Sequence, residues 1–403
     1  MSAQGNQRGA TSVSRLSHDD VVAWATSMVE RLSERAVEAE ALRELPQATM
    51  DDAVASGVFE MLVPSERGGH GLGLRSLGEM TRILAHGCVS SAWTLLFLVL
   101  HNWFVARGPQ EFQAAVWGDQ PYVLMPGTLA PTGTATPVDA GYELSGRWQW
   151  ATGVQHADWV MLNGLIHRDG PPEARFFVLP IADVEVIDVW HTSGMRGTGS
   201  NDVVADRVFV PAHQTLAALE LAGNYPPGAE LSADPFVRYP MVPVLTLVAA
   251  AAALGGAEAA VEHFRERLSS RVLAFSMGDR QAEQPAAQIR LSQAQATLRA
   301  TRLVWDDAVD QVCEVYDGGG VFETVDRGRI RLAAAQTVRM SIDTVGTVLE
   351  GSGASVHFAD SPLQRISRDL LTLRGHMVFD WDRTAELAGK LELGLDPAAT
   401  DLL

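Results

Sequence analysis

Residues 190–211 read WHTSGMRGTGSNDVVADRVFVP, and this stretch does most to decide the fold. Glycines stand at positions 194, 197 and 199 among short polar residues, and the β-branched run 203–210 follows directly. Such a loop lets backbone N–H groups approach a ligand closely, and it leads into a strand. The dinucleotide fingerprint GxGxxG precedes a helix and a P-loop requires a lysine, so neither nucleotide site is predicted.

A second informative stretch, SPLQRISRDL, spans residues 361–370. Ser361 and Pro362 are typical of the cap and first turn of a helix, and we expect this helix to run past Trp381. His376 follows Asp369 by seven residues, which is two helical turns. Apolar residues recur at positions 363, 366, 370, 373 and 377, so His376 lies at the edge of the buried face and can point inward.

The third stretch lies upstream, where residues 148–159 read WQWATGVQHADW. Aromatic rings flank a Thr-Gly turn, and a strand follows. A hydroxyl on a tight turn beside flat rings suits a planar heteroaromatic cofactor. A hairpin whose tryptophans are simply buried in the core fits the same residues, so both interpretations stay open here.

Around these stretches the pattern predicts a mainly α protein with a β middle. Residues 1–15 are a polar tail, and 16–120 form an N-terminal helical domain whose central helix is the apolar run 92–104. Residues 121–218 hold short β-branched runs at 159–165, 175–179, 184–189 and 203–210, which predict antiparallel strands of a barrel-like domain. Residues 219–403 return to helical periodicity and predict a C-terminal four-helix bundle.

Composition excludes several classes of function. Hydrophobic residues make up 47% and charged residues 20%, which excludes a disordered chain. The net charge of −18 argues against a nucleic-acid partner or an anionic membrane surface. Cys88 and Cys313 lack metal or disulfide spacing and indicate a reducing, cytoplasmic location. Residues 239–257 carry no charge, but their many alanines favour a buried helix over a membrane span.

Taken in order, the three stretches resemble the acyl-CoA dehydrogenase fold superfamily. Within it, the chain is most similar to two-component, reduced-flavin-dependent monooxygenases of the hydroxyphenylacetate hydroxylase type, from about residue 16 to residue 393. The resemblance implies a homotetrameric oxygenase component that receives reduced FMN or FAD from a separate NAD(P)H-dependent reductase. With O2 the flavin would form a C4a-hydroperoxide that hydroxylates an aromatic molecule, phenolic or polycyclic. The chain lacks a dinucleotide fingerprint, which agrees with a separate reductase.

The carboxylates distinguish the oxygenase branch from the dehydrogenases. A dehydrogenase needs a carboxylate base to remove an α-proton, and the family usually places this glutamate shortly after the pair corresponding to Arg368-Asp369. Here the sequence contains no glutamate between Glu350 and Glu386, and residues 237–257 hold no carboxylate. A standard acyl-CoA dehydrogenase is therefore disfavoured.

The resemblance assigns substrate roles to two histidines. His376 matches a histidine that holds or deprotonates the phenol, since imidazole, with a pKa of about 6.5, can polarise a phenol, with a pKa of about 10. His101 shares an apolar helical face with Trp93, Phe97 and Phe104, and the resemblance places it beside flavin and substrate. A surface histidine that caps a helix and a core histidine with a buried partner are the alternatives.

The flavin contacts implied by the resemblance are spread over several loops. Thr152 stands where relatives usually carry a serine that bonds flavin N5, and threonine keeps the hydroxyl but adds a methyl group. Arg271 matches an arginine that reaches the flavin phosphate across a subunit interface, although an ordinary solvated arginine fits equally well. The other flavin candidates are Trp150, Gly153, Thr198, Ser200, Gln288 and the turn 351–353, and the substrate candidates are Trp93, Trp103, His101 and His376.

Three classes of function stay open at this point. The first is the oxygenase, including variants that oxidise nitrogen or sulfur; His376 favours a phenol, because a heteroatom lone pair needs no help with deprotonation. The second is an atypical acyl-CoA dehydrogenase with an unrecognised base, and the third is a non-catalytic member of the fold. The residues do not distinguish FMN from FAD, or a single-ring phenol from a polycyclic substrate.

Overall fold

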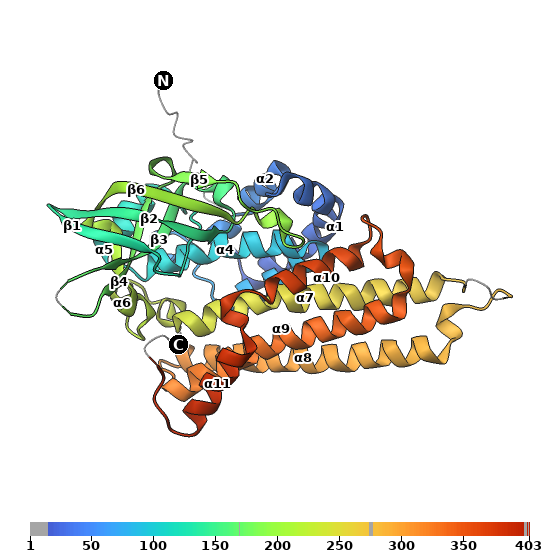
Figure 1. Ribbon diagram of the computed structural model, residues 1–403. Helices are drawn as coiled ribbons and strands as arrows, with labels where there is room; N and C mark the ends of the chain where they lie inside the picture. Colours follow the sequence, from blue (N-terminus) through green and yellow to red (C-terminus); the bar gives the residue numbers. More distant parts are fainter. Residues whose placement is uncertain (1–14, 169, 274–276, 399–400, 402) are drawn as a thin grey trace.

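The computed structural model describes residues 15–403 except 169, 274–276, 399–400 and 402. Helices come first along the chain: α1 (His18–Leu42), α2 (Gln47–Ser56), α3 (Leu74–Gly87), α4 (Val89–Ala106) and α5 (Gln110–Trp117). All residues of α4 are buried, because this helix lies between the sheet and the C-terminal helix α7 (Figure 1). The expected central helix 92–104 is thus a central helix in the structure.

The middle of the chain forms one seven-stranded sheet of order β5-β6-β2-β1-β3-β4-β7. One pairing differs from the expected antiparallel pattern, because β1 and β3 run parallel with Gly133 opposite Gly164. The chain after β2 crosses over β1 and places β3 on the other side of β1. Because β3 runs opposite to β2, and β2 runs opposite to β1, β3 is parallel to β1. The strands are β1 (Gly133–Val138), β2 (Gly141–Ala151), β3 (Trp159–Ile166), β4 (Glu173–Pro180), β5 (Glu185–Ile187), β6 (Asn201–Pro211) and β7 (Thr215–Ala217).

The short helix α6 (Ala218–Ala222) leads from the sheet to the long C-terminal helices. The bundle consists of α7 (Met241–Ser270), α8 (Pro285–Asp317), α9 (Thr324–Ser352) and α10 (Pro362–Leu373), followed by α11 (Trp381–Glu392). Small residues let α7 pack closely on α3: a Cβ at Gly255 would lie 2.0 Å from the carbonyl oxygen of Arg82.

The prediction of one helix from Ser361 past Trp381 is wrong. The segment forms two helices, because α10 ends at Leu373 and α11 begins at Trp381. Gly375 weakens helix continuation, and Asp380 begins the new helix, since its side chain accepts from the backbone N–H of Arg383 at 3.0 Å. The turn between the two helices carries His376.

Two helices among the described residues, α4 and α7, are long and apolar enough to span a membrane. Both are core helices of the folded chain, because 100% and 94% of their most apolar windows are buried inside the protein. The expectation of a buried helix at residues 239–257 is confirmed for the part of this segment that lies in α7.

A fully buried cation joins the N-terminal helices to the chain that follows the sheet. Arg107 comes directly after α4, where the helix C-terminus favours positive charge. Burial lowers the pKa of this guanidinium to about 9. It donates five hydrogen bonds of 2.6–3.0 Å to the carbonyl oxygens of Leu221, Gly223, Val237 and Tyr239.

Candidate active site

One face of α4 carries a row of rings. The ring centroids lie 4.9 Å apart for Trp93 and Phe97, 5.7 Å for Phe97 and His101, and 5.4 Å for His101 and Phe104. Side chains three and four residues apart lie on the same side of a helix, so this row follows from the spacing alone. The residues expected to share a face of the central helix do share it.

His101 is buried within this row and has a defined polarity. Its Nδ1 lies 2.5 Å from the carbonyl oxygen of Met125. A carbonyl oxygen only accepts, so Nδ1 carries the hydrogen and the lone pair of the neutral ring is on Nε2. Burial lowers the pKa of His101 to about 4, so the imidazole is neutral at physiological pH. His101 therefore presents a hydrogen-bond acceptor at Nε2, and a Cβ at Gly127 would stand 3.5 Å from that atom.

His376 approaches the same row from the turn after α10, and not from within a helix. Its ring centroid lies 5.7 Å from that of Trp93 and 6.1 Å from that of Phe379. Its Nδ1 accepts from the backbone N–H of Val378 at 3.4 Å, which leaves the hydrogen of the neutral ring on Nε2. His376 is exposed and caps the short helix Met377–Phe379, as the surface alternative expected, and desolvation by the groups around the ring lowers its pKa to about 4. Met377, which we expected on the buried face, is 41% exposed.

The two imidazoles are therefore neutral and opposite in polarity: Nε2 accepts in His101 and donates in His376. The ring of His376 contacts Trp93, which precedes His101 by eight residues, or about 12 Å along α4. The row of rings on α4 has an acceptor, Nε2 of His101, and a donor, Nε2 of His376, near its two ends. Rings with such polar groups are suited to contact with a flat aromatic molecule that carries a polar substituent.

Several flavin candidates from separate stretches of the chain lie together beside α4, where Gly153 packs against Thr94 and Leu98. The hydroxyls of Thr152 and Ser200 are 3.0 Å apart, and those of Ser200 and Thr198 are 2.7 Å apart. The backbone N–H of Gly153 donates to the carbonyl of Thr198 at 2.9 Å. Gly153 has φ 73°, and a Cβ there would stand 2.9 Å from Cγ2 of Thr94, so only glycine suits this turn.

A buried carboxylate holds the glycine loop in place, which the sequence reasoning missed. Asp369 accepts from the backbone N–H of Met195 at 2.6 Å and from the hydroxyl of Ser90 at 3.3 Å. Burial raises the pKa of Asp369 to about 6 in spite of the Met195 hydrogen bond. Met195 is left-handed at φ 53°, and its carbonyl oxygen accepts from the indole N–H of Trp190 at 2.8 Å. The Arg-Asp pair was the signal, but the contact between Asp369 and Met195 spans 174 residues.

The tryptophans of the WQW stretch have different environments. Trp148 is buried in the sheet and donates to the carbonyl of Asn163 at 2.6 Å, as the core interpretation expected. Trp150 is 54% exposed, and its ring centroid lies 5.8 Å from that of Trp190. An exposed indole, the partly exposed Thr152 and an ordered glycine loop therefore lie together. This combination fits an isoalloxazine ring, which needs a flat apolar contact and polar groups at its edge.

Trp103 is not brought to this site. It is 1% exposed, and its indole N–H donates to the carbonyl of Phe236 at 2.6 Å. The void that it lines beside Leu100 and Val244 measures about 10 Å³, which is barely room for one water molecule. The assignment of Trp103 to the substrate is therefore corrected: it is a core residue, because it faces away from the row of Trp93 and His101.

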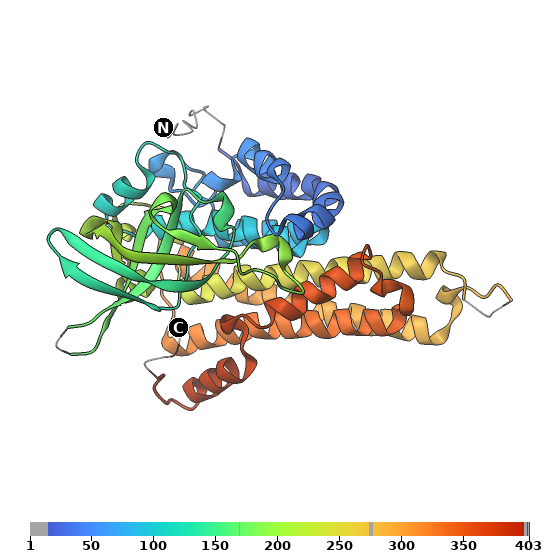
Figure 2. The same cartoon turned by 45° about the horizontal axis from the view of Figure 1, so that its top comes forward.

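Arg271 and Gln288 lie at the end of the bundle farthest from the sheet (Figure 2). Arg271 donates to the carbonyl of Ser352 at 2.6 Å, and a Cβ at Gly353 would stand 3.0 Å from its Nη1. Gln288 donates to the carbonyl of Ala282 at 3.0 Å. The structure thus brings the turn 351–353 to Arg271, but it does not bring Arg271 to Thr152 of the same chain.

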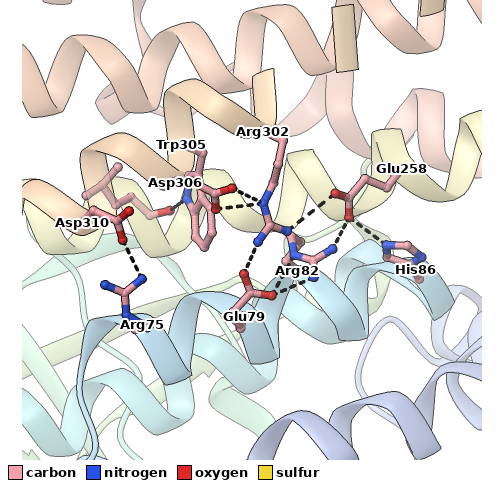
Figure 3. Close-up of polar contacts among 10 residues, drawn as sticks. Arg75, Glu79, Arg82, His86, Glu258, Arg302, Trp305, Asp306 and Asp310 are labelled. Carbon is pink, nitrogen blue, oxygen red and sulfur yellow. Dashed lines mark hydrogen bonds and ion pairs between the residues drawn. The ribbon is translucent and has the colours of Figure 1, made fainter. Parts of the chain in front are cut away.

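The first carboxylate of α7 belongs to a polar network that joins α3, α7 and α8 (Figure 3). Glu258 accepts from Arg82 at 2.5 Å and from His86 at 2.9 Å, and Arg302 lies 3.8 Å away. Burial alone would raise the pKa of Glu258, but the hydrogen bonds from His86 and Arg82 and the charge of Arg82 hold it below its usual value. Glu258 is therefore fully engaged, which argues against a role as the base of a dehydrogenase.

A helical region before the sheet in the chain, the seven-stranded sheet and a bundle of long helices after it, with the row of rings on α4, define a protein of the acyl-CoA dehydrogenase fold. The family model for the acyl-CoA dehydrogenase C-terminal domain matches residues 247–381. The crystal structure of the HsaA monooxygenase from M. tuberculosis superimposes with a TM-score of 0.89 at 30% identity, covering 96% of this chain and 100% of that chain. XiaF from Streptomyces sp., in complex with FADH2 and glycerol, gives 0.89 at 26% identity, covering 96% and 98%.

Sequence similarity defines the family more narrowly. The flavin-dependent monooxygenase, oxygenase subunit HsaA, of Rhodococcus jostii (strain RHA1) is 32% identical over 372 residues, which are 92% of this chain and 97% of that protein. The chain therefore belongs to the oxygenase subunits of flavin-dependent monooxygenases, which use reduced flavin and O2. The resemblance seen in the sequence and the cofactors that it implied are confirmed.

Proposed function

We propose that this oxygenase component hydroxylates a phenolic aromatic compound, either single-ring or polycyclic, with reduced FMN or FAD from a separate NAD(P)H-dependent reductase. The observation that carries the proposal is the pair of neutral histidines of opposite polarity beside one row of rings. A phenolic O–H donates to Nε2 of His101, and an oxygen at the other end of the substrate accepts from Nε2 of His376.

The catalytic contribution of His101 is to polarise the phenol. A hydrogen bond from the phenolic O–H to Nε2 raises electron density in the aromatic ring, which makes the ring a better nucleophile. Trp93, Phe97 and Phe104 enclose the substrate and exclude water. His376 would orient the substrate by donating a hydrogen bond from Nε2 to its far oxygen.

The flavin is assigned to the surface formed by Trp150, Thr152 and the loop 194–200. The exposed indole of Trp150 and the hydroxyl of Thr152 would hold the flavin, the first by an apolar contact and the second by a polar one. Gly153, Thr198 and Ser200 hold Thr152 in place. When bound, the reduced flavin activates O2 and supplies the oxygen atom that enters the substrate.

A homotetramer accounts for Arg271 and Gln288. Both residues lie at the end of the bundle away from the sheet, so they can serve the flavin only of another subunit (Figure 2). The fork of the Arg271 guanidinium is suited to a phosphate. Such an enzyme, with two cysteines that are both free, belongs in the cytoplasm.

The test compares p-hydroxyphenylacetate and resorcinol, compounds named for relatives of this chain, with phenylacetate, which lacks the phenolic hydroxyl. The purified chain receives reduced FMN or FAD in aerated buffer, and hydroxylated product and hydrogen peroxide are measured. We expect product from at least one phenol and none from phenylacetate. The variant His376→Ala should consume the same oxygen but release hydrogen peroxide in place of product. Equal product from phenylacetate, or full product in His376→Ala, would overturn the proposal.

Oxidation at nitrogen or sulfur fits the site less well. A heteroatom lone pair needs no proton acceptor, whereas the acceptor at Nε2 of His101 is fixed by the Met125 carbonyl. An atypical dehydrogenase is also disfavoured, because Glu258 is bound to arginines and Asp369 is bound to the Met195 N–H.

A further inference from the structure

Four oxygen atoms form a hydrogen-bonded row behind the proposed flavin surface. They are the carbonyl oxygen of Met195 and the hydroxyl oxygens of Thr198, Ser200 and Thr152, with successive separations of 2.9, 2.7 and 3.0 Å. Thr198 and Ser200 are buried, whereas Thr152 is partly exposed at the end of the row. The row thus starts inside the protein and ends at the surface where the flavin is proposed to bind.

The direction of this row follows from counting hydrogens. Three hydroxyls supply three hydrogens for three links, and the Met195 carbonyl can only accept. All three links are therefore made only when Thr198 donates to Met195, Ser200 donates to Thr198, and Thr152 donates to Ser200. If Thr152 turned its hydrogen outward, the row would lose one hydrogen bond. The Met195 carbonyl thus decides which way the Thr152 hydroxyl points.

The Met195 carbonyl is itself held from two sides. The peptide N–H of the same residue donates to buried Asp369, and the indole of Trp190 donates to the carbonyl oxygen. The left-handed conformation of Met195 is thereby fixed, and with it the position of the acceptor that begins the row.

We infer that the row makes Thr152 a hydrogen-bond acceptor toward the flavin, and that the site thereby selects reduced over oxidised flavin. This inference rests on the proposed flavin site. N5 of a reduced flavin carries a hydrogen and donates, whereas N5 of an oxidised flavin has only a lone pair. With reduced flavin the row makes four hydrogen bonds, from N5–H through to Met195. With oxidised flavin the Thr152 hydroxyl must turn its hydrogen toward N5, one link of the row is lost, and only three hydrogen bonds remain.

The preference is worth one hydrogen bond, which corresponds to about five-fold in the ratio of dissociation constants, Kd(oxidised)/Kd(reduced). For a two-electron couple, a five-fold change is about 20 mV in the midpoint potential of the bound flavin. Other contacts contribute to the ratio in the wild type, so the change between variants is the quantity that tests the inference.

The experiment measures both dissociation constants anaerobically, together with the midpoint potential of the bound flavin. Thr198→Val keeps the side-chain shape but removes the hydroxyl next to Met195, so either direction of Ser200 and Thr152 makes the same number of bonds. Ser200→Ala also frees Thr152 to turn. In both variants we expect Kd(oxidised)/Kd(reduced) to fall about five-fold and the potential to fall by about 20 mV, whereas Thr198→Ser keeps the wild-type values.

An unchanged ratio in both Thr198→Val and Ser200→Ala, with flavin still bound, would overturn the inference alone. A fall of the same size in Thr198→Ser would also overturn it, because that variant keeps the hydroxyl. Failure of the wild type to bind reduced flavin would instead overturn the proposed function, so the two failures are distinguishable.

Discussion

The polarity of His101 gives a prediction whose size follows from the structure. His101→Asn removes Nε2 but keeps an amide N–H near the position of Nδ1, within reach of the Met125 carbonyl. Complete transfer of a proton from a phenol of pKa about 10 to an imidazole of pKa about 4 would cost six pKa units, or about 8 kcal/mol. His101 therefore accepts a hydrogen bond and does not take the proton.

Losing one such hydrogen bond should lower kcat/KM for the phenol by about two- to ten-fold, since neutral hydrogen bonds contribute about 0.5–1.5 kcal/mol. Losing a general base would cost about 10²- to 10⁴-fold. The assay measures hydroxylated product from the best phenol of the panel, for wild type and His101→Asn, between pH 5 and pH 8.5. Because the lowered pKa keeps His101 neutral throughout, its contribution to kcat/KM should be constant and should fall only as the pH drops toward 4.

Two results would refute this reasoning. One is a loss of more than a hundred-fold in His101→Asn with the fold and flavin binding intact. The other is a wild-type profile that bends near pH 6.5 and becomes flat in the variant. Either result would mean that His101 takes the proton during the reaction. His101→Leu, which loses the donor to Met125 as well, separates the effect of Nε2 from that of ring placement.

Three further predictions concern Asp369, Glu258 and Arg271. Burial raises the pKa of Asp369 to about 6, so between about pH 4 and 6 the folded state binds more protons than the unfolded state. The stability of wild type relative to Asp369→Asn should therefore fall by about 3 kcal/mol as the pH rises from about 4 to 6. A difference in thermal unfolding that stays constant over this range would contradict the prediction. Glu258→Gln removes one carboxylate from a network in which Arg82 keeps Glu79, and Arg302 keeps Glu79 and Asp306, so it should lower stability by about 2 kcal/mol with unchanged product formation by the folded enzyme; lost activity at an unchanged Tm would count against it. Arg271→Met should weaken flavin binding. If each site takes Thr152 and Arg271 from different subunits, mixed oligomers of the Arg271→Met chain and the Thr152→Val chain should regain flavin binding at up to about a quarter of their sites, because both intact residues meet there by chance. Mixed oligomers that regain no flavin binding would exclude the shared site.

Helical periodicity predicted the row on α4 from Trp93 to Phe104, because residues three and four apart share a face whatever surrounds the helix. Trp103 was misplaced because it was chosen for its aromatic ring, whereas its position in the helix turns it away from His101. The turn that carries His376 was indicated by Gly375 and Asp380, but continuous apolar spacing suggested a single helix.

Contacts between distant segments were beyond sequence reasoning. Two-residue periodicity would put Trp148 and Trp150 on the same side of β2, yet one is buried and the other exposed. The pairing of β2 with β6 shifts register between Trp148 and Ala151, and this irregularity depends on the partner strand. The hold of Asp369 on Met195 likewise depends on how α10 packs against the glycine loop.

The buried guanidinium of Arg107 has a consequence for how the chain can be divided. All its carbonyl acceptors lie between Leu221 and Tyr239, beyond the last strand of the sheet. A fragment that stopped at residue 218 would keep the cation but lose all of these acceptors, and an unsolvated charge without partners is strongly unfavourable. The regions named along the chain are therefore not autonomous folding units. The N-terminal helices acquire their native interior only after the segment that follows the sheet has been synthesised and has docked.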